Sequence, residues 1–160
     1  EPGASCSFGV FAGVGTATTN ASVHANLVAI ANTVAGSYNV SVTATGASPD
    51  SFALTNRAAA PTTLTAIAGS GQSQQVGLAF PVNLQATLKD AYNNFVPNAL
   101  VTFTAPSTGA SGTFLTGSRI DTVRTSAEGV ATARTFTANN IAGGPYTVSA
   151  TVPDVANPAT

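Results

Sequence analysis

Residues 36–46 read "GSYNVSVTATG", and residues 144–154 read "GPYTVSATVPD". In each stretch a tyrosine leads a series of apolar side chains that alternate with polar or small ones. A period of two is typical of antiparallel strands with one buried face, because successive side chains point to opposite faces. We therefore expect an all-β protein in which the rings of Tyr38 and Tyr146 pack inward and do not serve as exposed sugar-binding platforms.

The same alternation runs through most of the chain, and no segment has the pattern of a convincing amphipathic helix. Clusters of Gly, Pro, Asn and Asp separate the alternating segments at intervals of roughly 8–12 residues, which favours a sandwich or barrel. In 130–138 the apolar positions change phase between Ala133 and Phe136, which predicts a β-bulge. From residue 57 onward, the expected strands are 62–68, 80–89, 98–105, 112–116, 119–124, 130–138 and 145–152.

The composition is poor in charge and excludes some classes of partner. Charged residues make up 7% of the chain, against roughly 25% in ordinary soluble proteins, and the formal net charge is −1. No basic stripe exists to neutralise phosphates, so nucleic acid is not an expected partner. No apolar run approaches the roughly 18 residues that cross a bilayer, so we expect no membrane insertion in this segment. Residues 1–10 lack the pattern of a signal peptide.

The two tyrosine-led stretches belong to a longer internal repeat with a period near 107 residues. Such a period is typical of tandem domains, since solenoid repeats run to roughly 20–50 residues. About seven strands per unit predict an immunoglobulin-like Greek-key β-sandwich. The sequence offset between aligned residues grows along the chain, and single-residue insertions near Gly129 and Gly144 account for this growth. Both insertions fall in turns. The aligned segments are 4–8 with 110–114, 18–22 with 124–128, 31–36 with 138–143, and Tyr38 with Tyr146, and His24 falls on Ala131.

This alignment predicts two incomplete copies. Residues 1–56 form the C-terminal half of one repeat, and residues 57–160 form a second repeat that lacks its last strand. The sequence "SFALTN" at 51–56 is the expected last strand of the first copy. A half-sandwich exposes apolar faces and open strand edges to water. The chain is therefore either a window of a long array or a subunit that neighbouring copies complete with their own strands.

Three motifs carry a family resemblance. An acidic and Asn-rich turn enters a Val-Pro pair at Asp90, Asn93, Asn94, Val96 and Pro97. A second turn runs through Thr125, Gly129 and Val130, and a third motif is Gly144, Tyr146 and Val148. Together they resemble the bacterial immunoglobulin-like repeats of invasin- and intimin-type surface proteins and giant adhesins. The resemblance covers 57–160 and extends to 1–56 as a partial copy, where "TTNASV" lacks the glycine before Val23.

The resemblance implies an extracellular or cell-surface bacterial protein whose domains run end to end. The expected function is a structural module, acting as a stalk, spacer or filament of an adhesin or biofilm protein. The expected partners are neighbouring copies or adjacent repeats. The alternative is an adhesin module that binds glycan or host protein through its loops, and its candidate contacts are Tyr92 and Phe95 in "DAYNNFV".

No residue set favours an enzyme or a bound cofactor. His24 is the only histidine, which leaves no paired base for a nucleophile. We expect Asp90 and Asn94 to cap a turn, because one carboxylate is too few for calcium. The remaining metal hypothesis is calcium at an inter-domain joint, held by Asp50 or Asp154 with a neighbour's residues. Cys6 is read as a small hydrophobic strand residue beside Phe8, with an intermolecular bridge or reactive thiol as the alternative.

Overall fold

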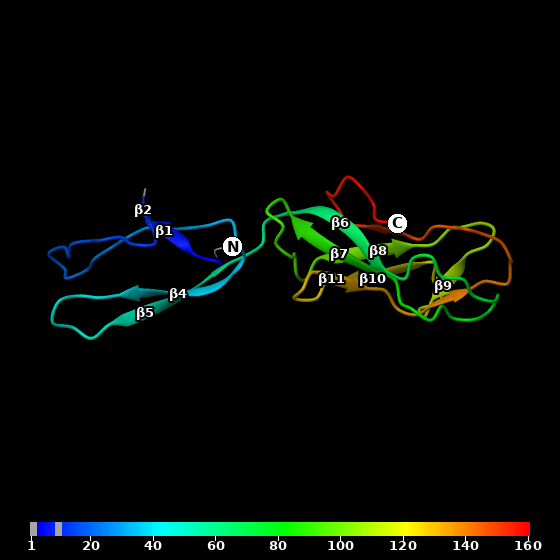
Figure 1. The fold of residues 1–160 in the computed structure, drawn as a ribbon, viewed down its shortest axis with the longest axis horizontal. Coiled ribbons are helices and arrows are strands. Elements are labelled where there is room, and N and C mark those ends of the chain that lie inside the picture. Colours follow the sequence, from blue (N-terminus) through cyan, green and yellow to red (C-terminus); the bar gives the residue numbers. More distant parts are fainter. Residues whose placement is uncertain (1–2, 9–10) are drawn as a thin grey trace. The chain divides into compact units, whose positions relative to one another are not determined.

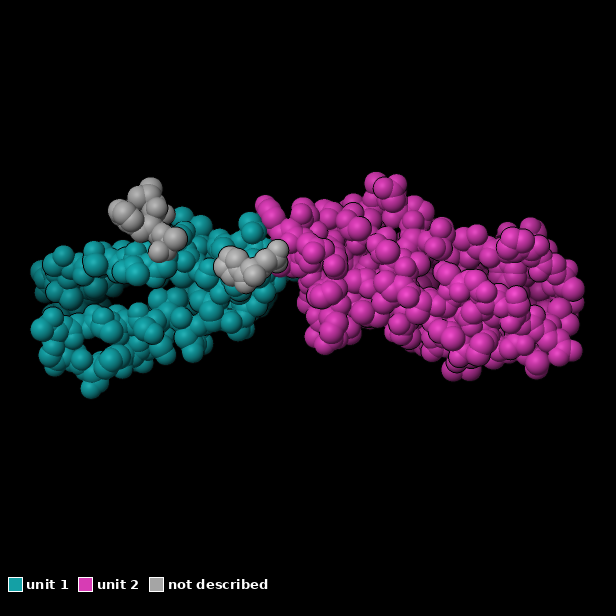
Figure 2. All heavy atoms as spheres, viewed as in Figure 1, with its two compact units in different colours: residues 1–58 teal, residues 59–160 magenta. Residues whose placement is uncertain are grey.

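The computed structural model describes residues 3–8 and 11–160, and every regular element in that part of the chain is a β-strand (Figure 1). Neighbouring strands pair antiparallel throughout. The prediction of an all-β antiparallel protein is therefore confirmed. The chain divides into two compact units, residues 1–58 (unit 1) and 59–160 (unit 2), which Figure 2 colours separately. The sequence alignment places the boundary two residues earlier, after residue 56.

Unit 1 contains a small sheet and a hairpin. The sheet has the order β2-β1-β3, with β1 spanning Cys6–Phe8, β2 spanning Phe11–Ala12 and β3 spanning Ala29–Ala31. The hairpin joins β4, Gly36–Val42, to β5, Asp50–Asn56, so the first tyrosine-led stretch does form a strand. Tyr38 lies opposite Leu54, and Val40 lies opposite Phe52. Alternate residues of β4 are half-buried from Gly36 to Val40.

Unit 2 contains three antiparallel sheets, of orders β11-β7-β6, β10-β8-β13 and β12-β9. Sheet β10-β8-β13 ends on β13, whose outer edge has only an isolated bridge from Ala150 to Ala159. The strands are β6 (Pro61–Ala68), β7 (Gln85–Asp90), β8 (Leu100–Thr104), β9 (Gly112–Phe114), β10 (Ile120–Arg124), β11 (Val130–Thr132), β12 (Phe136–Ala138) and β13 (Ser149–Thr151).

The core of unit 2 is built from the inward positions that the period of two predicts. Leu88 on β7, Val101 on β8 and Phe114 on β9 are fully buried. Phe114 also contacts Phe136, with ring centroids 4.9 Å apart, a separation at which aromatic pairs attract beyond their buried area. Burial of these side chains supplies the main stabilising term, roughly 1.5–3 kcal/mol for each large apolar side chain.

Two predicted strands lose at least half of their expected length. The strand predicted over 80–89 begins at Gln85, and the one predicted over 145–152 spans only Ser149–Thr151. The alternation in 145–152 is nevertheless present, since Ala150 and Val152 are buried and Tyr146 is half-buried. Regular pairing is lost at Tyr146 because, among the described residues, no strand lies beside 143–148.

The predicted strand 130–138 is interrupted, and the predicted bulge is wrong. β11 pairs with β7, whereas β12 pairs with β9, and residues 133–135 between them belong to no strand. The chain thus changes partner strand, which lets Ala133 and Phe136 both be buried despite their opposite phase. The backbone N–H of Arg134 at this break needs an acceptor, and the Asp121 carboxylate supplies one, as described below.

Unit 1 has almost no core by comparison. Within its described residues Asn56 is the one buried side chain, and many large apolar side chains are exposed. Val28 is 78% exposed, and Phe52, on β5, is 62% exposed. Figure 2 shows openings between the atoms of unit 1 that unit 2 does not have in the same view. Two small layers without covering strands leave their apolar faces in water.

Candidate functional site

The turn after β7 is organised by the Asp90 carboxylate. Asp90 is buried, and its Oδ1 accepts hydrogen bonds from the backbone N–H groups of Tyr92 and Asn94, each at 2.9 Å. Its Oδ2 accepts from the Ala59 N–H and from the Asn94 side-chain amide, also at 2.9 Å. The prediction that Asp90 and Asn94 cap this turn is therefore confirmed. Burial alone would raise the pKa of Asp90, but these hydrogen bonds outweigh it and lower the pKa.

The two predicted loop contacts, Tyr92 and Phe95, lie in this turn and are exposed. Tyr92 is 59% exposed and Phe95 is 47% exposed. The Lys89 ammonium lies over the Phe95 ring, 4.8 Å from its centroid, within the range of a cation–π interaction. Phe95 also lies against Gly129, where an added Cβ would come within 3.0 Å of the phenylalanine Cβ. Phe95 thus has a packing role in unit 2, whereas Tyr92 presents more of its ring to solvent.

The turn before β11 has a counterpart with the same hydrogen bonds in unit 1. Ser126 N–H donates to Val130 O and Gly129 N–H donates to Ser126 O, while Ser126 Oγ accepts from the N–H groups of Glu128 and Val130. In the unit 1 turn, Asn20 N–H donates to His24 O and Val23 N–H donates to Asn20 O. The Asn20 Oδ1 accepts from the N–H groups of Ser22 and His24.

Val23 and Gly129 occupy the same place in these two turns. Gly129 has φ +68°, and Val23 has φ +65°, a left-handed conformation that a β-branched residue rarely adopts. The missing glycine in "TTNASV" therefore leaves the turn intact but forces the valine into a strained backbone conformation.

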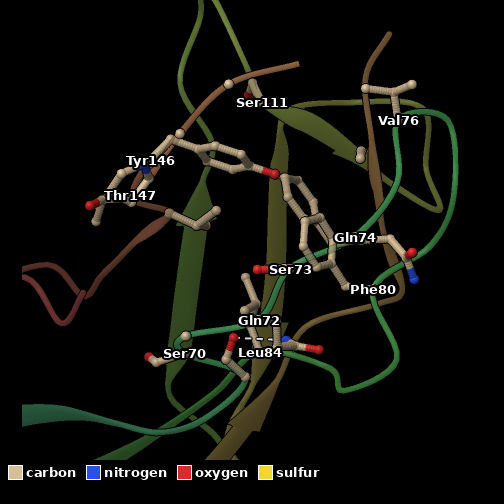
Figure 3. Close-up of a pocket in the computed structure, with 18 of the residues that line it drawn as sticks. Ser70, Gln72, Ser73, Gln74, Val76, Phe80, Leu84, Ser111, Tyr146 and Thr147 are labelled. Carbon is tan, nitrogen blue, oxygen red and sulfur yellow. Dashed lines mark hydrogen bonds between the residues drawn. The ribbon is translucent and has the colours of Figure 1, made fainter. Parts of the chain in front are cut away.

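A cavity of about 1070 Å³ in unit 2 lies beside Tyr146 (Figure 3). Phe80, Leu84 and Phe136 form much of its apolar wall, and Tyr146 and Val148 line it from the segment that precedes β13. The phenyl rings of Phe80 and Phe136 stack with centroids 5.6 Å apart. The lining also includes residues 70–75, most of which are polar.

Tyr146 reaches into this cavity with a hydroxyl that has no hydrogen-bond partner. In Figure 3 its hydroxyl points toward Phe80. The oxygen is buried and unpaired among the described residues. Burial raises the pKa of Tyr146 above its ordinary value, because the charged phenolate is poorly solvated there. The prediction that this ring faces inward is confirmed, and an unpaired buried hydroxyl costs roughly 1–3 kcal/mol.

Asn139 clamps the loop that borders the cavity. Its Nδ2 donates to Gly109 O at 2.9 Å, and its Oδ1 accepts from the N–H groups of Ser111 and Ile141 at 3.3 and 3.2 Å. Its own backbone N–H donates to Ser111 O at 2.8 Å. One asparagine thus joins the segment before β9 to the segment after β12.

Unit 1 contains the same clamp at Asn32, with one added member. Asn32 bonds to Gly3 O, to the Ser5 backbone and to the Val34 N–H. Asn56, the last residue of β5, then donates from its Nδ2 to Ser5 O, Asn32 Oδ1 and Val34 O at 2.9, 2.9 and 3.2 Å. The end of β5 is therefore locked onto the clamp by a side-chain amide.

The remaining candidate residues do not form a chemical site. His24 lies exposed in its turn, and Cys6 is a half-buried free thiol on β1, in the strand that the sequence predicts. The part of the chain with described positions holds no group of three His, Cys, Asp or Glu residues that could bind a metal. Asp50 accepts a hydrogen bond from the Ser51 N–H, and Asp154 adopts φ +66° in a turn.

Sequence reasoning missed two features. No sequence motif singles out Asp121, yet it is buried, pairs with the Arg134 guanidinium and accepts the Arg134 N–H at 2.8 Å. Its position in the alternating pattern could have indicated its burial, because Asp121 shares the inward face of β10 with Val123. The role of Asn32 and Asn139 was also missed, although each follows an alanine at the end of a strand in the aligned segments.

No protein-family model, no curated protein and no solved structure matches this chain. Within the described residues, no helix is long and apolar enough to cross a membrane.

Proposed function

We propose that this chain is a structural extracellular module of a bacterial surface protein, acting as a stalk, spacer or filament. On this proposal its units are successive copies of one immunoglobulin-like Greek-key β-sandwich, repeated about every 107 residues. The observation that carries the proposal is the equivalence of hydrogen bonds between the two units. A chain that repeats one packing unit, with a polar uncharged surface, suits an architectural role.

The first support is the strand register around the two asparagine clamps. Cys6 pairs with Ala31 as Gly112 pairs with Ala138, and Phe8 pairs with Ala29 as Phe114 pairs with Phe136. All three pairs of β1 and β3 recur in β9 and β12 at the offsets of the sequence alignment. The four hydrogen bonds of Asn139 also recur at Asn32. Agreement of register and side-chain bonding by chance is improbable for two unrelated segments.

The second support is the matching pair of turns, which also corrects the alignment. The hydrogen bonds equate Val23 with Gly129 and His24 with Val130, so the insertion near Gly129 is wrong. The extra residue of unit 2 lies between Val130 and Phe136, where the chain changes partner strand. Insertions are tolerated where no ladder pairing is interrupted.

The test begins with the intact protein from its source, measured by mass under denaturing conditions. A mass many times 15.7 kDa supports an array in which further repeats supply the missing strands, and a mass near 15.7 kDa supports a self-assembling subunit. Antibodies against residues 59–160 should label intact cells, and external protease should remove that signal. A protein that is reached only after cell lysis contradicts the proposal.

The alternative function is adhesion through the Tyr92–Phe95 turn, and the exposure of both rings on one rigid turn favours it. The test is binding of the chain to host cells or to a glycan array after Tyr92→Ser. We choose Tyr92 because it leaves the Phe95 packing intact. The matched control is Leu115→Ser, which removes an exposed apolar side chain from another turn. Loss of binding in the first variant alone supports adhesion, and equal binding by both variants contradicts it.

A further inference from the structure

The outer edge of β13 is an unfinished strand pairing. β13 pairs with β8 on one side, and on the other side only Ala159 is bonded, through reciprocal backbone hydrogen bonds with Ala150 of 2.8 and 2.9 Å. Toward Tyr146 the described chain offers no further partner. Exposed strand edges present unpaired N–H and C=O groups that bind another strand readily.

Unit 1 shows the completed version of this edge. In the β4–β5 hairpin, Val42 pairs with Asp50, Val40 with Phe52 and Tyr38 with Leu54. The residues of unit 2 aligned with Val42, Val40 and Tyr38 are Ala150, Val148 and Tyr146. Ala159 lies opposite Ala150, at the place where Asp50 begins β5. The pairing in unit 2 therefore starts in the register of the hairpin and then stops.

The cavity lies where the missing strand would place its side chains. Tyr146 and Val148 line it, as does Thr160, the residue after Ala159. Its apolar wall of Phe80, Leu84 and Phe136 would bury the inward side chains of a strand on this edge. The unpaired hydroxyl of Tyr146 is a second sign that packing here is incomplete.

The clamp beside the cavity also lacks one member. In unit 1 the Asn56 amide donates to Ser5 O, Asn32 Oδ1 and Val34 O. The equivalent acceptors in unit 2 are Ser111 O, Asn139 Oδ1 and Ile141 O, and Ser111 and Ile141 line the cavity. Among the described residues, no side-chain amide donates to this second set of acceptors. A strand ending in asparagine would complete it.

We infer that this edge and cavity of unit 2 bind the terminal strand of a further copy of the repeat, an extended peptide with the β5 sequence Asp-Ser-Phe-Ala-Leu-Thr-Asn. The Phe-Ala-Leu-Thr-Asn part of this strand runs antiparallel to residues 144–148, beyond the bridge between Ala150 and Ala159, with its leucine opposite Tyr146 and its phenylalanine opposite Val148. Its last side chain donates to the Asn139 clamp. This inference rests on the proposed function in treating the two units as copies of one repeat. It extends that function by naming the receptor surface, the donor strand and the register.

The test uses the full chain and a fluorescently labelled synthetic peptide of residues 50–56. We expect saturable binding by fluorescence anisotropy, with amide chemical-shift changes centred on residues 139–150. A peptide with Phe52→Ser and Leu54→Ser should bind more than tenfold more weakly, because two buried apolar side chains are lost. A peptide with Asn56→Ala should bind about 5- to 10-fold more weakly, as expected for lost hydrogen bonds.

Matched variants of the chain locate the site. Val148→Asp places a charge in the cavity and should abolish binding, whereas Leu115→Asp, at an exposed turn residue that does not line the cavity, should leave it unchanged. The amide spectrum of each variant checks its fold. If Val148→Asp unfolds, the milder Val148→Thr should still weaken binding several-fold.

The outcomes separate this inference from the proposed function. Self-association of the chain that the peptide competes away supports the inference. Absence of peptide binding by a folded chain overturns it, as does binding that Val148→Asp or the double-serine peptide leaves unchanged. Each of these results is obtained on purified chain, so it is independent of the mass and the surface labelling that test the proposed function.

Discussion

The two units have closely similar local structure and very different burial. Unit 1 has the β1–β3 pairing, the asparagine clamp and the turn of unit 2, yet only Asn56 is buried among its described side chains. Unit 2 adds β6, β7 and β8, which cover the apolar residues. β7 pairs with β6 and β11, and β8 pairs with β10 and β13. Local hydrogen bonds therefore form the same arrangement with or without a core. The core depends on strands that lie far away in the sequence.

The largest expected contrast concerns Phe114 and its counterpart Phe8, which hold the same position in β9 and β1. Phe114→Ala removes a fully buried ring and should lower the free energy of unfolding of unit 2 by about 3–5 kcal/mol. Phe8 is half-buried, so Phe8→Ala should cost less than about 1 kcal/mol. Residue-resolved hydrogen exchange in urea measures both. Equal losses would contradict the view that only unit 2 has a core.

The second prediction concerns Asp121, which has no acidic counterpart in unit 1. Asp121→Ala leaves the Arg134 N–H without its acceptor at the strand break and should destabilise unit 2 by about 2–4 kcal/mol. Arg134→Gln should cost less, because the Arg134 side chain is half exposed and its backbone bond remains. Chemical denaturation of both variants gives the comparison. A larger loss from Arg134→Gln would assign the stabilisation to the ion pair instead of the backbone acceptor.

The third prediction uses the equivalent turn positions Gly129 and Val23, where substitutions are expected to change the stability of the turn in opposite directions. Gly129→Ala strains a left-handed backbone and brings its Cβ within 2.7 Å of Leu88 O, so it should cost about 1–3 kcal/mol. Val23→Gly relieves strain of about 1–2 kcal/mol but adds chain entropy, for a net gain of about 0.5 kcal/mol. Amide exchange of residues 20–24 and 126–130 reports both changes. Protection that falls after Val23→Gly would show that the valine is not strained.

The smallest expected effect is the pH dependence from Asp90. Because hydrogen bonds lower its pKa in the folded state, its contribution to stability is complete above the ordinary value of 3.8. The contribution is lost as the pH falls below 3.8 and through the lower pKa of the folded protein. The free energy of unfolding of the wild type minus that of Asp90→Asn should therefore shrink as the medium is acidified. The contributions of the other carboxylates are present in both proteins and cancel in this difference. A difference that stays constant from pH 6 to pH 2 would contradict the assigned shift.

Much of the local structure could be predicted because it depends on neighbouring residues. The alternation at Ala86 and Leu88 predicted their burial, and Asp90 followed by Asn94 predicted the capped turn. The partner change at residues 133–135 could not be predicted, because it depends on where β7 and β9 lie in space. The cavity at Tyr146 was not predicted for the same reason, since its walls combine residues from 69–84 with residues from 136–148, more than 50 positions later.

The sequence by itself determined the period of two and the positions of the turns, because these follow from residue type and spacing. Only the tertiary structure decided which tyrosine-led stretch forms a full strand. Gly36–Val42 is paired along its length because β5 lies beside it, whereas 144–148 has the same pattern and stays unpaired. Alternating side chains define the face that a strand can bury, but its hydrogen bonds require a partner strand at its edge.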